Sequence, residues 1–501
     1  MSIWQLLMSE TIHNSCARFE TGEGLMRLAI RAFTYTDQNR FAAISGDHNP
    51  MHMDPLQARR TQAGAPVVHG IHLLLWALDS LAAAQPDLPP LRGFRAQFNK
   101  FVFLDDPVEA VLTQKGPSGA RLAISVDGAP RSKVTIDFGD HVEECPGWFS
   151  SALEAIPHSD AALNLSLEEM SGRSGRLSFR MTPEDAAALF PAAVRWLGGH
   201  RVAALAATTH LVGMVCPGLH SIYQELSVTA CAGSDDSSSL AFRVTETDSR
   251  FRSIEQEIAG GGFTGIVKSF ARTPPVQQAT MQSLVRVVGP TDFAGSTALI
   301  VGGSRGLGEL TAKLIAAGGG RVLVTWQAGK DDAERVSKEI RSGGGECETL
   351  AYDARKPAAD QFARLTDAPT HAYYFATPAI FRPQSDIFST ERLQEFLAIY
   401  VDGFWQLSQA LRARQPRLSM FYPSSVSVTE RPKGMTEYTM AKAAGEVLCA
   451  DMNVWLAPTH VTVTRLPRLP TDQTASVTPA ESADPLETML PIIREVQSWP
   501  R

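Results

Sequence analysis

Two histidines, two aspartates and an asparagine crowd the ten positions Ser45–Asp54 (SGDHNPMHMD). Asp47 and His52 lie five positions apart, and the Asn-Pro pair between them predicts a turn that brings the carboxylate and the imidazole to one point. A carboxylate and an imidazole that flank one water molecule can activate it or donate a proton to a leaving hydroxyl. This spacing therefore indicates acid/base chemistry that adds or removes water.

Two other interpretations of this stretch remain open. One is a metal cluster, which would draw on four histidines: His48, His52, His69 and His72. The Asn-Pro pair interrupts the helix that would align the first two, and no pattern of supporting partners accompanies them, so we expect no bound metal. The other interpretation is a polar turn with a purely structural role.

A long apolar segment, His69–Ala83 (HGIHLLLWALDSLAA), follows the polar stretch. Its Leu and Ala content predicts a buried helix rather than a strand. The first backbone N–H groups of a helix have no partner inside it, so they are available to polarise a thioester carbonyl. We expect His69 to hydrogen-bond at the helix entry and His72 to have its hydrogen bonds satisfied in the core.

The polar stretch and the helix entry together resemble a known family. FAAISGDHNPMHMD, followed by PVVHG, resembles the MaoC-like hot-dog (R)-specific enoyl-thioester hydratases. A later segment, FRAQFNKFVFLDDPVEA, also resembles that family, with Asp105 where a glycine usually stands. The resemblance implies that Asp47 and His52 are the catalytic pair and that the Gly70 amide donates to the oxyanion. It also implies two supporting side chains, Asn49 and Asp54.

Residues 177–272 repeat the plan of the hydratase-like residues 1–150. In both, an apolar helix precedes alternating strands, and in the second copy this helix is Arg201–Val215. A buried helix wrapped by a curved antiparallel sheet suits that order, so we predict a double hot-dog with a connector over Ser150–Arg176. The second copy lacks the Asp/His spacing, and we expect it to supply acyl room and stability. Two of its histidines are left out of the expected site: His210 and His220.

A glycine-rich loop opens the third segment, residues 291–501, where alternating strands and helices predict a doubly wound parallel α/β sheet of the Rossmann type. VGGSRGLG, Val301–Gly308, follows a buried strand and starts a helix, which lets the backbone approach a pyrophosphate at the helix N-terminus. The loop residues expected to bind a dinucleotide are Gly302, Ser304, Arg305, Gly306, Leu307 and Gly308.

A tyrosine and a lysine four positions apart, Tyr438 and Lys442, share one face of a predicted helix. Tyrosine has an ordinary pKa of about 10, and a neighbouring ammonium together with a nicotinamide cation favours the phenolate. Tyr438 is thus expected to pass a proton near neutral pH. Ser425, 13 positions earlier, is expected to hydrogen-bond a substrate carbonyl.

The glycine loop, the serine and the Tyr-x-x-x-Lys pair, in this order, resemble the short-chain dehydrogenase/reductase family over about residues 291–471. The resemblance implies that Ser425, Tyr438 and Lys442 are catalytic and that the last two also bind the cofactor. A reductase of this family commonly interconverts 3-oxoacyl and 3-hydroxyacyl thioesters.

The expected cofactor is NADPH. Arg305 can meet a 2′-phosphate, and the second strand, RVLVTWQAGK, ends without an acidic residue to bind a free 2′-hydroxyl. The resemblance also implies that Asp353, in YDAR, lies on the adenine side of the cofactor.

Several positions depart from the reductase pattern. The usual Asn-Ala-Gly turn stands as Phe375–Pro378 (FATP), and Tyr400 stands where a catalytic asparagine is usual. The late Pro-Gly stands as Pro467-Arg468, and we recognise no final strand beyond it. These departures predict a reductase that is slow or narrow in substrate.

The overall composition limits the class of protein. A chain of 501 residues suggests about three domains, and a net charge of −7 argues against a nucleic-acid binder, which would need a basic face. The N-terminus lacks the basic start of a signal peptide, and no apolar window of about 18 residues predicts a membrane span. Six cysteines lie far apart without a CxxC pair, so we expect neither a zinc knuckle nor a disulfide framework, as in a cytoplasmic protein.

A 3-hydroxyacyl thioester is the species that the two implied chemistries share. We therefore predict an (R)-specific enoyl-thioester hydratase or dehydratase joined to an NADPH-dependent 3-oxoacyl reductase, in fatty-acid, polyketide or glycan-acyl assembly. Acyl-CoA and acyl carrier protein both fit as the carrier. Hot-dog sheets usually pair, either in a homodimer or, with a double repeat, within one chain.

Three rival interpretations differ in which part is active. The chain could be a hydratase with an inactive reductase-like scaffold, or a reductase with a hot-dog module that binds an acyl carrier. It could also be a non-catalytic assembly protein. The retained Ser425, Tyr438 and Lys442 argue against the first, the intact Asp47/His52 pair against the second, and both motifs against the third.

Overall fold

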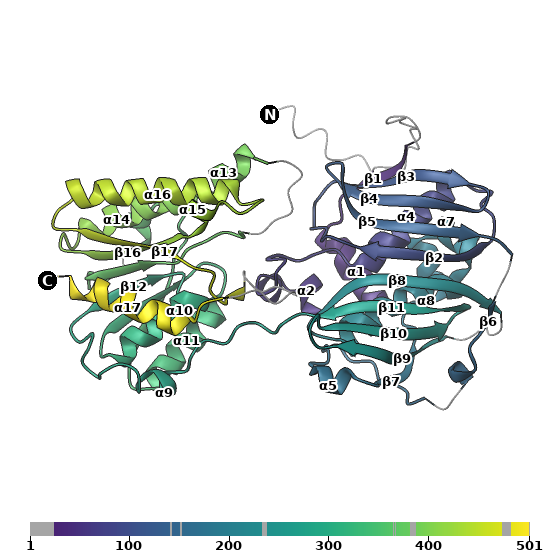
Figure 1. The fold of residues 1–501 in the computed structure, drawn as a ribbon, viewed down its shortest axis with the longest axis horizontal. Coiled ribbons are helices and arrows are strands. Elements are labelled where there is room, and N and C mark those ends of the chain that lie inside the picture. Colours follow the sequence, from purple (N-terminus) through teal and green to yellow (C-terminus); the bar gives the residue numbers. More distant parts are fainter. Residues whose placement is uncertain are drawn as a thin grey trace. The chain divides into compact units, whose positions relative to one another are not determined.

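The computed structural model describes residues 25–140, 143–150, 153–232, 238–363, 365, 367–380, 387–472 and 482–499. The chain forms two compact units: Met1–Ala58 with Ala65–Thr273, and Arg59–Gly64 with Pro274–Arg501 (Figure 1). The first unit contains both predicted hot-dog copies, and the second contains the predicted Rossmann segment. The fold class expected from the sequence, a double hot-dog followed by a doubly wound parallel sheet, is confirmed.

One continuous antiparallel sheet unites the two hot-dog copies. Its strand order is β1-β3-β4-β5-β2-β8-β11-β10-β9-β7, with the short β6 paired to β8. The first copy gives β1 (Met26–Arg31), β2 (Leu91–Phe98), β3 (Val108–Gly116), β4 (Gly119–Val126) and β5 (Ala129–Phe138). The second gives β7 (Ser174–Ser178), β8 (Ser221–Ala232), β9 (Ser239–Asp248), β10 (Ser253–Gly260) and β11 (Phe263–Ala271). The copies join where β2 pairs with β8, with Phe94 opposite Val228.

Two apolar helices fill the concave side of this sheet, as expected (Figure 1). They are α4 (Gly70–Ala84) and α8 (Gly199–His210), and α8 continues into a π-helical turn, Leu211–Val215. The smaller helices of the unit are α1 (Tyr35–Ser45), α2 (Pro50–Met53), α3 (Pro55–Ala58), α5 (Leu167–Met170), α6 (Pro183–Leu189) and α7 (Pro191–Leu197), with a 3-10 turn at Gly147–Ser150. Leucine and alanine on nearly every turn of α4 and α8 allow burial on almost all sides.

The connector of this unit differs from the expectation. The predicted connector over residues 150–176 contains α5 and the start of the edge strand β7. In the first copy, strand β2 ends at Phe98, because the amides of Asn99 and Lys100 both turn to the Arg131 carbonyl.

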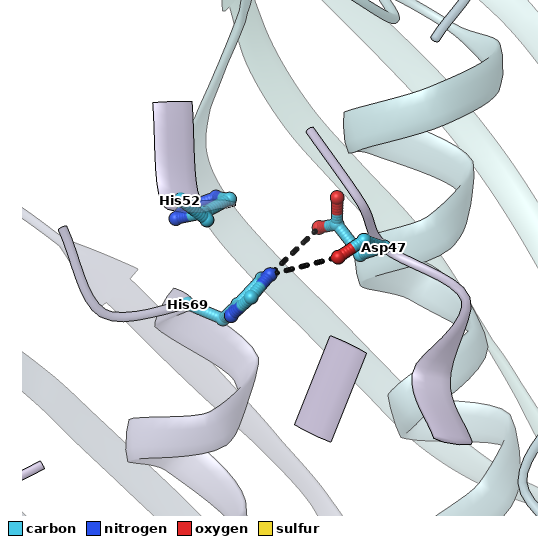
Figure 2. Close-up of side chains that lie close together, drawn as sticks. All are labelled: Asp47, His52 and His69. Carbon is cyan, nitrogen blue, oxygen red and sulfur yellow. Dashed lines mark hydrogen bonds and ion pairs between the residues drawn. The ribbon is translucent and has the colours of Figure 1, made fainter. Parts of the chain in front are cut away.

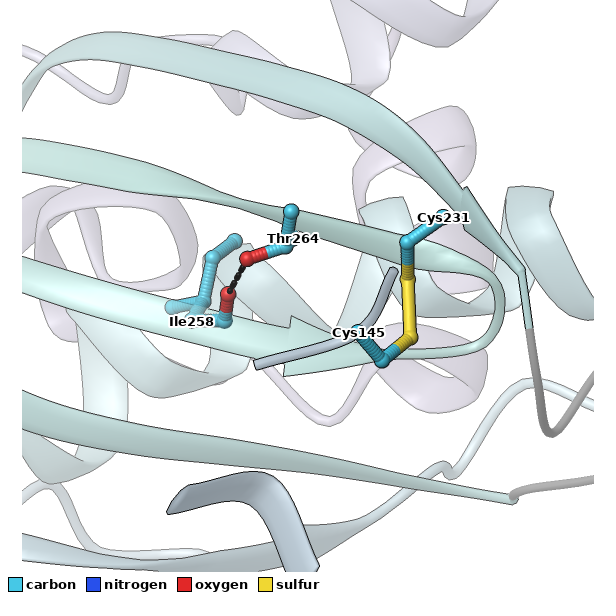
Figure 3. The surroundings of a disulfide bond; sticks show 4 residues. All are labelled: Cys145, Cys231, Ile258 and Thr264. Atoms are coloured by element: carbon cyan, nitrogen blue, oxygen red, sulfur yellow. Dashed lines mark hydrogen bonds between the residues drawn. A yellow bond between two sulfur atoms is a disulfide. The ribbon is translucent and has the colours of Figure 1, made fainter. Parts of the chain in front are cut away.

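A disulfide joins Cys145 to Cys231, so the expectation of no disulfide was wrong (Figure 3). The two cysteines are 86 positions apart in the sequence. They meet because β6 (Glu143–Glu144) pairs in parallel with β8, which places Glu143 opposite Cys231. Only this long-range pairing makes them neighbours, and the spacing of cysteines along the chain does not reveal it. Cys216, Cys347 and Cys449 are free and buried, and Cys16 lies outside the described residues.

The second unit holds a six-stranded parallel sheet in the order β14-β13-β12-β15-β16-β17. Its strands are β12 (Thr297–Val301), β13 (Arg321–Trp326), β14 (Glu346–Ala351), β15 (His371–Tyr374), β16 (Ser419–Ser425) and β17 (His460–Leu466). Its helices are α9 (Met281–Leu284), α10 (Gly306–Ala317), α11 (Lys330–Ser342), α12 (Ala358–Gln361), α13 (Thr390–Leu397), α14 (Phe404–Arg412), α15 (Ser427–Glu430), α16 (Thr436–Trp455) and α17 (Pro485–Ser498), with a π-helical turn at Ala398–Gly403.

Both faces of this parallel sheet are covered, which is why its strands read as continuous apolar runs. Ile300 on β12 joins a core with α10, α11 and α17, whereas its neighbours Leu299 and Val301 join a core with α13, α14 and α16. In the described part of the chain, β17 is the last strand and α17 follows it. None of the described helices has the length and apolar character needed to cross a bilayer.

His72 is buried in the hot-dog core, but its Nδ1 lacks the hydrogen bond expected for it among the described residues. Its ring stacks on Phe41 at 4.4 Å between centroids and meets the edges of Phe33 and Phe190. Among the described residues, none hydrogen-bonds its Nδ1. Burial, with a smaller effect from Arg31, lowers the pKa of His72 from 6.5 to about 3.

Replacing His72 with phenylalanine should remove part of the acid sensitivity of folding. Unfolded His72 takes up a proton below pH 6.5 while the folded form resists it down to about pH 3, so stability is lost as the pH falls through that window. Between pH 7 and pH 5, protonation of this group in the unfolded chain lowers the free energy of unfolding by about 2 kcal/mol. Urea unfolding of wild type and His72→Phe at both pH values measures it. An equal pH dependence in the two proteins would contradict this account.

Candidate active sites

The loop between α1 and α2 carries the predicted hydratase pair. Gly46 ends α1 in a left-handed conformation, with φ 80°. Asn49 begins α2 because its side chain accepts the Met51 amide, and Pro50 follows at the first helical position. The predicted turn therefore exists as a helix cap, which leaves Asp47 in the loop and His52 on the helix.

Asp47 is almost completely buried, with 1% of its surface exposed, and its carboxylate is held by hydrogen bonds. Its Oδ1 accepts the Asn49 amide at 3.1 Å. Its Oδ2 accepts the Thr209 hydroxyl at 2.6 Å and lies 3.8 Å from His69 Nε2 (Figure 2). These contacts fix the orientation of a carboxylate that would be costly to bury without partners.

One hydrogen bond fixes the orientation of the His52 ring. Its Nδ1 lies 2.8 Å from the Val67 carbonyl oxygen, which can only accept, so Nδ1 is the donor. In the neutral ring, Nε2 then keeps the lone pair. The ring stacks on His69 with centroids 4.0 Å apart (Figure 2). Since one atom each of Asp47, His52 and His69 lie within 4.8 Å of one another, the predicted pair does converge.

His69 contributes more to the site than a hydrogen bond at the helix entry. Its Nδ1 faces Gln38 Oε1 and its Nε2 faces the Asp47 carbonyl, each at 3.1 Å. The Gln38 amide nitrogen donates to the Val67 carbonyl, which fixes the Gln38 oxygen toward His69. Burial holds the pKa of His69 well below its usual value, which favours a neutral ring that donates to only one of the two oxygens, Gln38 Oε1 or the Asp47 carbonyl, at a time. The His69 ring thus lies between Gln38 and the backbone of the Asp47 loop.

The other residues named for this site have separate positions. Gly70 is the first residue of α4, and a Cβ there would lie 3.1 Å from the Phe98 ring. Its role as oxyanion donor stays a prediction. Asp54 accepts the amides of Leu56 and Gln57 and therefore supports α3. Asp105 has φ 64°, a left-handed conformation, which explains why a glycine usually stands there.

The glycine-rich loop of the second unit has the shape that a pyrophosphate requires. It links β12 to α10, and Gly302 and Gly306 have φ values of 77° and 58°. A Cβ on Gly308 would lie 2.3 Å from the Gly302 carbonyl oxygen, whereas a Cβ on Gly306 would meet, among the described residues, only Thr471 at 3.9 Å. Within the described part of the chain, the loop is therefore closely packed against itself at Gly308 and uncrowded beside Gly306, in a way that fits a dinucleotide.

Two charged residues predicted to bind the cofactor already have protein partners. Arg305 donates to Asp472 at 2.9 Å, and burial lowers the pKa of its guanidinium. Asp353 accepts both the backbone and the side chain of Arg355. Ser304 and Leu307 lie in the loop beside them. The assignment of these four residues to the cofactor stays a prediction.

Ser425, Tyr438 and Lys442 come together at the end of β16 and the start of α16. Ser425 is the last residue of β16 and hydrogen-bonds Tyr438 on the first turns of α16. Lys442 is buried beneath them, with Nζ 5.8 Å from the centre of the Tyr438 ring. The order and spacing in the sequence thus predicted a true spatial cluster.

The electrostatics of this cluster differ from the expectation. Burial raises the pKa of Tyr438, and the Ser425 hydrogen bond offsets this only in part. Burial also lowers the pKa of Lys442 to about 7. The ammonium donates to the Pro423 carbonyl and lies 3.9 Å above the centre of the Tyr400 ring. Lys442 therefore interacts with other groups as well, which weakens the stabilisation that its ammonium can give to a Tyr438 phenolate.

Two departures from the reductase pattern contact each other. The Tyr400 hydroxyl and the Thr377 hydroxyl, in the FATP turn, are 2.6 Å apart. Tyr400 lies in the π-helical turn and meets Tyr438 edge to face at 5.7 Å. The position predicted for the catalytic asparagine does face the site, but it presents a ring and a hydroxyl whose pKa burial holds well above 10.

Comparison with known proteins gives a family match for one segment of each unit. Residues 20–132 match the family model described as a MaoC like domain, and residues 296–460 match the model described as a KR domain. This chain joins a MaoC-like domain to a KR domain. The resemblances expected from the sequence are thereby confirmed, and the names MaoC-like and KR apply to the two matched segments.

Several solved structures are similar to part of the chain. A 3-oxoacyl (acyl-carrier-protein) reductase from Agrobacterium tumefaciens with NADP bound is 18% identical, with 41% of this chain and 88% of that one covered and a TM-score of 0.37. The oxidoreductase yciK from E. coli is 17% identical, covers 42% and 91%, and has a TM-score of 0.38. FolM alternative dihydrofolate reductase 1 from Brucella suis with NADP is 17% identical, covers 35% and 73%, and has a TM-score of 0.32.

Sequence reasoning missed three residues of the hydratase site: Gln38, Thr209 and Gly213. Gln38 precedes the motif, and the other two come from the second hot-dog copy. Thr209 and Gly213 are distant in sequence, and only the pairing of the two copies brings them to Asp47. The sequence predicted a hydrogen bond of His69 at the helix entry, but it did not predict the contact of His69 with the Asp47 carbonyl.

We expect the MaoC-like site to work without a metal ion. Asp47, His52 and His69 could each offer one ligand atom, but Thr209 already uses Asp47 Oδ2, and the Asp47 carbonyl faces His69 Nε2. Dialysis against EDTA should leave hydration of crotonyl-CoA within about twofold of the untreated rate. Activity that disappears on dialysis and returns with Zn²⁺ would contradict this expectation.

Proposed function

We propose that the chain is a bifunctional acyl-thioester enzyme. Its MaoC-like domain interconverts a trans-2-enoyl thioester and an (R)-3-hydroxyacyl thioester, and its KR domain reduces a 3-oxoacyl thioester with NADPH. The observation that carries this proposal is the convergence of the buried Asp47 carboxylate with the His52 imidazole, whose Nδ1 is held by the Val67 carbonyl. The Ser425–Tyr438–Lys442 cluster supports the second activity.

In the hydratase half-reaction, Asp47 and His52 act on one water molecule. His52 Nε2 accepts a proton as the water oxygen bonds to C3, while Asp47 orients that water. The negative charge that develops on the thioester oxygen is stabilised by the Gly70 amide at the start of α4. The proton that His52 took from the water is then delivered to C2, which completes the addition and restores the neutral imidazole. In the reverse direction the same groups remove a hydroxyl from C3 and a proton from C2.

In the reductase half-reaction, Tyr438 donates its proton to the ketone oxygen and Ser425 donates a hydrogen bond to the same oxygen. NADPH, when bound, supplies the hydride for C3. Burial keeps the Tyr438 hydroxyl protonated before the reaction, but it also raises the pKa, so proton transfer depends on a group that stabilises the phenolate. Lys442 lies below the Tyr438 ring and stabilises negative charge on the phenolic oxygen when it is protonated.

The shared intermediate argues for a thioester substrate. The KR reaction produces a 3-hydroxyacyl thioester, and the MaoC-like reaction can dehydrate it. The product of the first reaction is therefore the substrate of the second, and no further enzyme is needed between them. The glycine loop around Gly306, which the described residues do not crowd, would hold the pyrophosphate of NADPH. Either CoA or acyl carrier protein would present the same phosphopantetheine thioester, and the double hot-dog can provide its own paired sheet or form a homodimer.

A second candidate is a hydratase whose KR domain is a scaffold. The observation that favours it is the position of Lys442, whose ammonium is held by the Pro423 carbonyl and the Tyr400 ring. A lysine held in this way stabilises a Tyr438 phenolate less. The two candidates differ in one measurable property, which is consumption of NADPH.

Two single substitutions should separate the activities. Asp47→Asn removes the carboxylate but keeps its size, so hydration of crotonyl-CoA should fall by about 10²- to 10⁴-fold. Tyr438→Phe removes the acidic hydroxyl, so oxidation of NADPH with acetoacetyl-CoA should fall by a similar factor. Loss of enoyl absorbance and loss of NADPH absorbance measure the two rates.

Each variant is the control for the other. Asp47→Asn should keep the reductase rate, and Tyr438→Phe should keep the hydratase rate. Hydration by wild type without any NADPH oxidation, with both CoA and carrier-protein substrates, would instead select the scaffold candidate. Absence of both reactions would overturn the proposal.

The reductase rate should decline as the pH rises through about 7. The pKa of Lys442 is lowered to about 7, so its stabilising ammonium is present below this pH and is lost above it. In Lys442→Arg the guanidinium stays protonated, so any remaining activity should lose this basic limb. Profiles of kcat/KM against pH measure the effect. A wild-type profile that is flat from pH 6 to pH 9 would contradict it.

A further inference from the structure

The second hot-dog copy contacts the catalytic loop directly. The Thr209 hydroxyl on α8 donates to Asp47 Oδ2 at 2.6 Å, and both residues are buried. A hydroxyl bond to a carboxylate at this length belongs to the strong, charge-assisted class. The contact joins positions 162 residues apart, so the fold of the second copy determines where the catalytic carboxylate lies.

Thr209 and its neighbour Thr208 differ in the acceptor of their side-chain hydroxyls. A helical threonine commonly turns its hydroxyl back to a carbonyl of its own helix. Thr208 does so, donating to the Leu205 carbonyl at 2.7 Å. Thr209 donates to Asp47 instead, across from one hot-dog copy to the other.

The π-helical turn that follows α8 is shaped around the same carboxylate. A Cβ on Gly213 would lie 2.3 Å from Asp47 Oδ1, so only a residue without a side chain permits this approach. The Gly213 carbonyl accepts the Asn49 side-chain amide at 2.7 Å, and the Gly218 carbonyl accepts it at 3.1 Å. π-Turns within helices frequently occur at functional sites.

His210 adds a third contact to the loop. Its Nδ1 lies 2.7 Å from the Gly46 carbonyl, to which it donates, and Gly46 directly precedes Asp47. A Cβ on Gly46 would be 2.7 Å from this ring nitrogen, so Gly46 and His210 also pack closely. Three residues of the loop, Gly46, Asp47 and Asn49, are therefore all held by residues of the second copy.

We propose that Thr209 is a positioning residue for the hydratase reaction, and that the second hot-dog copy completes the active site by holding the Asp47 carboxylate against His52. This inference rests on the proposed hydratase function. It assigns the second copy a role in catalysis beyond the acyl room and stability expected from the sequence. Without the Thr209 hydroxyl, Asp47 Oδ2 loses its shortest bond and the carboxylate is free to rotate away from the reacting water.

The test compares Thr209→Val, Thr209→Ser and Thr208→Val with wild type in crotonyl-CoA hydration. Valine matches threonine in size but lacks the hydroxyl, so kcat should fall by about 10- to 100-fold while KM changes by less than about twofold. Serine restores the hydroxyl and should return kcat to within about threefold of wild type. Thr208→Val, which removes a neighbouring buried hydroxyl that does not bond Asp47, should keep the wild-type kcat.

The possible results distinguish failure of the positioning role from failure of the proposed hydratase function. A Thr209→Val protein with wild-type kcat, or a Thr208→Val protein with an equal loss, would overturn the positioning role while the hydratase function stands. A wild type that does not hydrate crotonyl-CoA or its carrier-protein equivalent would overturn the proposed function and the inference with it. Urea midpoints of the four proteins show whether a fall in kcat reflects unfolding, and serine rescue would not follow from a general loss of packing.

Discussion

A buried carboxylate is the constraint on which the MaoC-like unit depends. Desolvating the charge of Asp47 is costly unless hydrogen bonds replace the lost water. The Asn49 amide comes from its own loop, and the Thr209 hydroxyl comes from the other hot-dog copy. Gly213 allows the helix that carries Thr209 to approach closely enough. The site therefore requires both copies to be folded together, which the continuous sheet across β2 and β8 ensures.

The KR unit also buries a charged side chain of its proposed site, Lys442. Lys442 is buried among aromatic rings, where an ammonium is disfavoured, and its pKa falls to about 7. The Tyr400 ring and the Pro423 carbonyl compensate for some of the lost hydration. In the MaoC-like unit the buried charge is on Asp47, which belongs to the proposed catalytic pair. In the KR unit the Lys442 ammonium interacts in part with the Pro423 carbonyl and the Tyr400 ring, which are not reacting groups. The aromatic residue at position 400 is thus the physical reason for expecting a slow or narrow reductase.

Features that depend on neighbouring residues could be predicted from the sequence. The turn at Asn49-Pro50, the strand and helix around the glycine loop, and the i,i+4 pair of Tyr438 and Lys442 are all local patterns. Contacts that depend on the pairing of distant strands could not. The Cys145–Cys231 disulfide and the Thr209–Asp47 bond join residues 86 and 162 positions apart. The sequence predicted that Tyr400 occupies the usual position of the catalytic asparagine, but it did not predict the contact of Tyr400 with Thr377.

The central claim is that two chemistries on one chain meet at one 3-hydroxyacyl thioester. The most direct test incubates the protein with acetoacetyl-CoA and NADPH and follows the acyl-CoA products by mass. Wild type is predicted to form 3-hydroxybutyryl-CoA and then crotonyl-CoA, and the Asp47→Asn variant is predicted to stop at 3-hydroxybutyryl-CoA. If wild type oxidises NADPH and never forms crotonyl-CoA, or forms no reduced product at all, the claim of a shared intermediate is wrong.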